Sequence, residues 1–62
     1  MKFIELTGTD GDITCLTLIN PQLIAAVDPN VEEGYTVVFM ATGAKFSVTE
    51  TVEQIKEKLN EI

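Results

Sequence analysis

The chain has 62 residues, enough for one domain with a small core, and a chain of this size buries only about 60% of its unfolded surface. Ten carboxylates against four lysines give a net charge of −6, and so acidic a surface disfavours binding to nucleic acid. The sequence has no histidine and no arginine, which removes the commonest general base, the commonest metal ligand and the usual phosphate clamp. Cys15, the single cysteine, then lacks an activating base. We predict one domain over residues 1–62 that is not an enzyme and binds no metal or cofactor.

The first half of the chain predicts short strands separated by turns. Residues 2–6 alternate as a strand does, and residues 13–19 are rich in β-branched side chains. Between them, residues 7–12 hold two glycines and two aspartates, which predicts a turn. Asn20-Pro21 ends the second strand, because proline cannot donate into a central ladder. Residues 22–27 fit either a helix or a strand, and we favour a strand because strands flank the segment.

The second half predicts a hairpin followed by a helix. Residues 28–34 are polar and predict a loop. Residues 35–41 form the most β-like segment, which Thr42-Gly43 joins as a tight hairpin to residues 45–48. Residues 51–62 carry apolar side chains at helical spacing, and Thr51 followed by Gln54 fits a capping box. The apolar stripe of this helix comprises Val52, Ile55, Leu59 and Ile62.

These elements predict an α+β fold, a small antiparallel sheet or half-open SH3-like barrel of four to five strands closed by one C-terminal helix. The strands are apolar on both faces, unlike antiparallel strands that have one wet face. We expect the core to contain Phe3 or Ile4, Leu6, Leu16, Leu18, Leu23, Ile24, Val27, Val37, Phe39, Phe46, Val48, Val52, Ile55 and Leu59.

One helix can cover only one face of such a sheet, so the second face needs another cover. It is either the interior of a small barrel or a surface that contacts a second copy or an unidentified protein partner. The predicted contact residues are Val38 and Met40, with Leu16 and Leu18 from residues 13–19. Leu16 and Leu18 belong to both predictions, because the sequence does not decide between barrel interior and interface.

Two further patterns bear on metal binding and location. Asp10 and Asp12 around Gly11 match the first half of a calcium loop, but the later ligands are missing, so we interpret them as a turn. The apolar stretches break at Asn20-Pro21 and Asp28-Pro29, far short of the roughly 20 residues of a membrane helix. We predict a cytoplasmic protein without a membrane span.

Several segments also share the pattern of a known family: Asn20 to Ile24, the turn at Gly43, Lys45 to Val48, Glu50 to Ile55, and Leu6-Thr7 followed by Gly8 or Gly11. In these segments the chain resembles the FlbD-like family of flagellar and swarming motility accessory proteins. The resemblance implies a small cytoplasmic accessory protein of motility, with no catalytic residues to transfer to this sequence.

The functional prediction is therefore a non-catalytic protein-interaction module, resembling accessory proteins of flagellar or swarming motility. The alternative is an acidic decoy of the phage type, which would occupy the basic groove of a nucleic-acid-binding protein. A salt-insensitive apolar contact would favour the module, and a strongly salt-dependent complex would favour the decoy.

Overall fold

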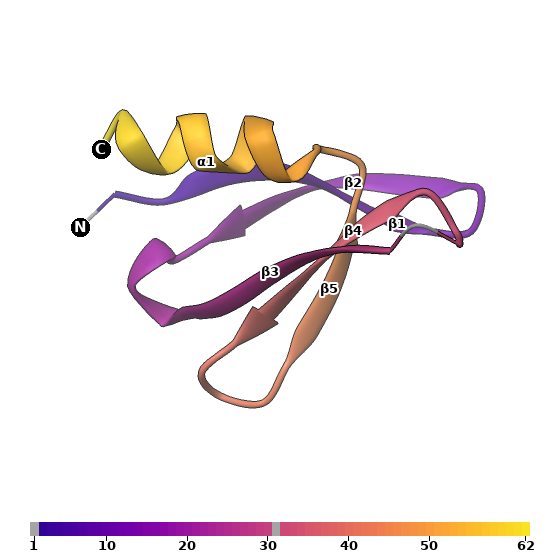
Figure 1. The fold of residues 1–62 in the computed structure, drawn as a ribbon, viewed down its shortest axis with the longest axis horizontal. Helices are drawn as coiled ribbons and strands as arrows, with labels where there is room; N and C mark the ends of the chain where they lie inside the picture. Colours follow the sequence, from indigo (N-terminus) through magenta and orange to yellow (C-terminus); the bar gives the residue numbers. More distant parts are fainter. Residues whose placement is uncertain (1, 31) are drawn as a thin grey trace.

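The computed structural model describes residues 2–30 and 32–62. A sheet and one α-helix make up the fold (Figure 1), as the sequence predicts. In chain order the elements are β1 (Ile4–Asp10), β2 (Ile13–Ile19), the 3-10 helix η1 (Pro21–Leu23), β3 (Ile24–Asn30), β4 (Tyr35–Met40), β5 (Lys45–Val48) and α1 (Val52–Asn60). Over the described residues, none of the helices has the length and apolar character needed to traverse a bilayer.

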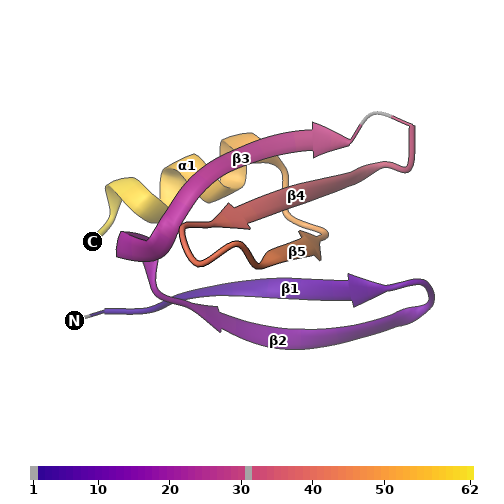
Figure 2. The same ribbon diagram turned by 90° about the horizontal axis from the view of Figure 1, so that it is seen from below.

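All neighbouring strands of the sheet are antiparallel, and their order is β2-β1-β5-β4-β3. The sheet curls so that the β1–β2 hairpin and the β3–β4 pair lie on opposite sides of β5 (Figure 2). β2 and β3 are its two edges and are not paired with each other, so the barrel stays half-open. The predicted α+β architecture is confirmed in its half-open form.

The Asn20-Pro21 element carries the chain from one edge of the sheet to the other. Asn20 caps η1, since its side-chain oxygen accepts from the Gln22 backbone N–H at 3.0 Å. Pro21 occupies the first helical turn, where no backbone donor is needed. The Leu23 carbonyl then accepts from the Ala41 N–H at 2.6 Å, which fixes the start of β3 beside the end of β4.

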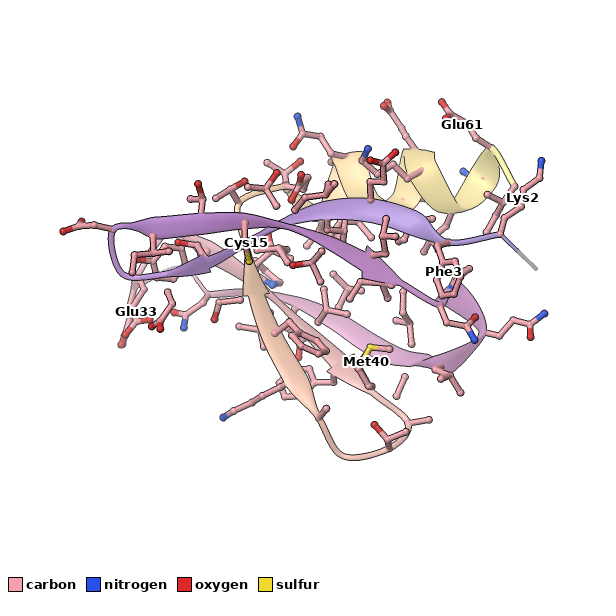
Figure 3. The ribbon with its side chains drawn as sticks, turned by 180° about the vertical axis from the view of Figure 1, so that it is seen from behind. Lys2, Phe3, Cys15, Glu33, Met40 and Glu61 are labelled. Carbon is pink, nitrogen blue, oxygen red and sulfur yellow. The ribbon has the colours of Figure 1, made fainter. Side chains whose placement is uncertain are left out.

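A single cluster of apolar side chains fills the inner face of the curled sheet. α1 lies across this face and adds Ile55, which is 1% exposed. Met40 packs against the cluster and lies between the β1–β2 hairpin and the β3–β4 pair (Figure 3). The buried members of the cluster are Ile4, Leu6, Ile19, Val38, Val48 and Ile55.

The helix begins where the sequence predicts and ends earlier. The capping box is present, with Gln54 N–H donating to Thr51 Oγ1 at 3.1 Å and Thr51 N–H donating to Gln54 Oε1 at 2.9 Å. The last helical residue is Asn60, and Ile62 beyond it is 53% exposed. Ile62 therefore does not extend the buried stripe, and this part of the prediction is wrong.

Two strands are longer than predicted. β1 continues through Thr7 to Asp10, and the turn is confined to Gly11 and Asp12, because β2 pairs with the whole of β1. Gly11 has a φ of 66°, a left-handed conformation that glycine adopts without strain. β3 runs through Pro29 into the segment predicted as a loop, which is allowed because an edge strand needs no donor on its free side.

The buried face of β4 is the opposite of the predicted one. Val38 is 0% exposed and belongs to the core, so its prediction as an exposed contact residue is wrong. Phe39 points the other way and is 37% exposed, and Phe46 of the predicted core is 39% exposed. Leu16 and Leu18 lie on the outer face and are exposed, and Leu23 is exposed as well, so the assignment of these three leucines to the core is also wrong. The alternation of apolar and polar residues could not show which face of β4 is buried, because both faces carry large apolar side chains.

Glu50 ties the junction between β5 and α1 to the middle of β1. Its carboxylate accepts two hydrogen bonds from the Thr7 N–H, at 2.8 and 2.9 Å, and one from the Thr7 hydroxyl at 2.9 Å. Burial acts to raise the pKa of Glu50, but the Thr7 hydrogen bonds and the charge of Lys58 together hold the pKa below its ordinary value. The ionised carboxylate therefore stabilises the fold.

Replacement of this carboxylate tests the link directly. We expect Glu50→Gln to lower the free energy of unfolding at pH 7 by about 1.5 kcal/mol, the low end of the range for a hydrogen bond to a charged group, because this bond is only part-buried. Because the folded-state pKa is lowered, this stabilisation is complete above the ordinary glutamate pKa and is lost as pH falls through the folded-state pKa. Urea unfolding at pH 7 and at about pH 2.5 should show the gap between wild type and variant closing in acid.

The exposed Glu33, in the turn between β3 and β4, provides the matched control. Glu33→Gln should leave the free energy of unfolding within about 0.5 kcal/mol of wild type. A Glu50→Gln penalty of the same size at both pH values would contradict the charge-dependent link.

Gly8 allows β1 and β2 to pack closely on the inner face. A Cβ at Gly8 would lie 2.7 Å from Thr17 Oγ1 and 3.5 Å from Cys15 Sγ. We expect Gly8→Ala to destabilise the protein by about 1–2 kcal/mol, after the smaller unfolded-state entropy of alanine is allowed for. In the Thr17→Ala background the same change should cost much less, which a double-mutant cycle of unfolding free energies would measure. Additive penalties would show that Thr17 is not the obstacle.

Candidate functional site

The most exposed large apolar side chains of the described residues gather on one strand, β2. Ile13 is 70% exposed, Leu16 69% and Leu18 58%. Cys15, between them, is exposed as well. We call Ile13, Cys15, Leu16 and Leu18 the β2 edge surface. β2 contains no charged residue, although the chain as a whole carries a net charge of −6.

The pairing of β1 with β2 explains why this surface is exposed on the outer face of the sheet. Leu16 lies opposite Thr7 and Leu18 opposite Glu5, and both partners carry polar side chains. α1 covers the inner face, so no element of the described chain packs over these leucines. Their exposure follows from having one helix and a sheet with two apolar faces.

On the inner face, the tip of the β1–β2 hairpin reaches beyond the helix and leaves a shallow hollow. Cys15 points from β2 toward β5 at this place (Figure 3). Gly8 lies opposite Cys15, and Ile13 and Phe46 also line the hollow. The hollow is lined by Gly8, Thr9, Asp10, Ile13, Cys15, Thr17, Lys45, Phe46 and Ser47. The β2 edge surface is therefore apolar on both faces of the strand.

The backbone of β1 shows which side of β2 is free. The Thr7 carbonyl accepts from the Thr49 N–H at 2.9 Å, and the Thr7 N–H donates to Glu50, so the backbone groups of Thr7 face β5. Successive residues of a strand direct their backbone groups to opposite sides. The backbone groups of Leu6 and Gly8 consequently face β2.

The partners of those two residues on β2 are Thr17 and Cys15, whose backbone groups are turned toward β1. By the same alternation, the N–H and C=O groups of Thr14, Leu16 and Leu18 are directed away from the sheet. A strand that presents free donors and acceptors together with apolar side chains can accept another strand.

The other edge of the sheet is protected. β3 contains Pro29, which has no N–H, and the charged Asp28. The register of β3 against β4 shifts between Ile24 and Ala26, which is a bulge or irregularity at the start of the strand. Proline, charge and bulges are the devices by which edge strands avoid pairing with other chains. β2 has none of them over its seven residues.

The four predicted contact residues are thus divided. Leu16 and Leu18 lie together on the exposed edge, whereas Val38 is in the core and Met40 packs against it. Sequence reasoning missed Ile13, whose place beside the turn at Gly11 was the available signal, since residues at a hairpin tip lie beyond the cover of a short helix.

The turn at Asp10, Gly11 and Asp12 is held by a local hydrogen bond, as expected of a turn with a purely structural role. Thr9 Oγ1 donates to the Gly11 carbonyl at 3.3 Å. Across residues 2–30 and 32–62, no three histidine, cysteine or acidic side chains gather as a metal site. A second hollow beside α1 is lined by polar side chains that include three carboxylates, of which Glu50 is already bound by Thr7.

Comparison with known proteins gives one result for the chain. No curated protein and no solved structure matches it. The family FlbD, described as flagellar and swarming motility proteins, matches over residues 3–62, nearly the whole chain. The segments from Leu6 to Ile55 that resemble this family in sequence lie within the match. The chain belongs to the FlbD family of flagellar and swarming motility proteins.

Proposed function

We propose that the protein is a non-catalytic interaction module of flagellar or swarming motility and that the β2 edge surface is its contact site. The observation that carries the proposal is the exposure of Ile13, Leu16 and Leu18 on one uncharged edge strand. Exposed apolar side chains that lie together commonly mark protein-binding surfaces, and a free strand edge adds main-chain hydrogen bonds to them.

The residue types support a role without catalysis. The chain has no histidine for proton transfer and no arginine for holding an anionic substrate. Cys15 has no histidine that could activate its thiol. Glu50, a carboxylate beside a hollow, has its oxygens bound by Thr7 and serves the fold.

The contact should depend on apolar burial and backbone pairing. Because β2 carries no charge, its affinity for a partner should not fall when salt screens surface charges. An acidic decoy would instead lose its basic partner steeply as salt rises.

A charge placed on β2 tests the proposal in cells. We expect Leu16→Lys/Leu18→Lys to reduce swarming to the level of a strain lacking the gene, because lysines on a strand edge oppose pairing with another chain. Both side chains are exposed, so the melting temperature of the purified variant should stay within a few degrees of wild type. Swarm expansion, with the protein level followed by immunoblot, is the measurement.

The matched control is Ile62→Lys, which also exchanges an exposed apolar side chain for a lysine but lies beyond α1. This variant should swarm like wild type. Wild-type swarming by a stable, normally expressed Leu16→Lys/Leu18→Lys variant would refute the proposed contact site.

A further inference from the structure

We infer that the β2 edge surface is occupied by β2 of a second copy of this chain, so that two sheets join across a two-fold axis at Leu16. The inference rests on the proposed function in taking β2 as the contact site, and it names the occupant. It follows from four features of the described residues: backbone direction, strand length, charge and the protection of the other edge.

Backbone direction and strand length make β2 complementary to itself. β2 runs from Ile13 to Ile19, so Leu16 is its central residue. The backbone groups of Leu16 are among those directed away from β1, and a residue of this kind can pair with its own copy across a two-fold axis. Antiparallel pairing of the full strand then places Leu16 opposite Leu16 of the second copy and Thr14 opposite Leu18, with roughly six backbone hydrogen bonds.

Side chains of opposite charge are not needed in this arrangement, because the paired residues of β2 are all uncharged. Thr14, Leu16 and Leu18 share the outer face, so the leucines of both copies form one apolar patch across the axis. On the inner face Cys15 lies opposite Thr17 of the second copy. Asp12, at the hairpin turn, lies opposite Asn20, so no carboxylate is set against a carboxylate within the paired strands.

Charge favours β2 over other surfaces for self-association. Each copy brings a net charge of −6, and two such chains repel each other wherever their carboxylates approach. β2 is a seven-residue strand without charge. A second copy, which carries the same net negative charge, is therefore repelled least at this strand.

Protection of the other edge limits the assembly to two copies. In the dimer both β2 strands are used, and the remaining edges are the two β3 strands, with Pro29 and Asp28. Such edges resist further pairing, so the joined sheet ends there and does not grow into a fibre.

Sedimentation equilibrium measures the association. We expect wild type to reach about 13.6 kDa, twice the 6.8 kDa of one chain, at micromolar concentration. Leu16→Lys should raise the dissociation constant roughly tenfold or more, equivalent to about 1.4 kcal/mol. Ile62→Lys should associate like wild type.

Disulfide trapping tests the register. In the proposed pairing Cys15 faces Thr17 of the second copy as a non-hydrogen-bonded pair with Cα atoms about 4.5 Å apart, within disulfide range. Wild type mixed with Cys15→Ser/Thr17→Cys should therefore form an oxidised dimer containing one chain of each. Either protein alone places its thiols on a diagonal of about 7–8 Å and should cross-link far less.

The outcomes separate this inference from the proposed function. A wild-type protein that remains at 6.8 kDa up to about 100 μM would overturn the dimer, because a pairing this weak would not form at cellular concentrations. If Leu16→Lys/Leu18→Lys still abolished swarming, the contact site would stand and its occupant would be a different chain. Equal cross-linking of wild type alone and of the mixture would overturn the register centred on Leu16.

Discussion

Packing of Ile55 against the inner face of the sheet determines which side chains this protein buries. Ile55 joins one cluster with residues of β1, β2, β4 and β5, so a single helical residue touches the core made by both halves of the curled sheet. Once α1 covers this face, Val38 must point inward and Phe39 outward. The outer face of the sheet then has no cover, because the chain contains no second helix of comparable length within its described residues.

Much of the architecture could be predicted, because local patterns specify it. The strand positions, the hairpin at Gly43 and the capping box of Thr51 each depend on a few neighbouring residues. The buried face could not be predicted, since β4 is apolar on both sides and the choice depends on α1, far away in sequence. For the same reason Leu16 fitted both the core and the contact surface, and only the placement of the helix separates these possibilities.

The residues that carry the family resemblance serve the fold. Asn20 and Pro21 form the 3-10 turn that leads from one edge strand to the other, and Glu50 fastens the start of α1 to β1. The β2 edge surface lies outside these segments. In this chain the proposed contact surface is therefore built by residues other than those that carry the sequence resemblance, although the family match spans both.

The free edge at β2 also means that binding of another strand there would raise the stability of this small domain. A core of six buried apolar side chains leaves a narrow margin over the conformational entropy of folding. Any chain that pairs with β2 binds the folded state and not the unfolded one, so its binding adds to the free energy of unfolding by mass action. While exposed, Leu16 and Leu18 contribute little to the stability of the isolated domain, and a strand bound over them would add to it. The uncovered strand thus leaves apolar area that folding does not bury and that binding would.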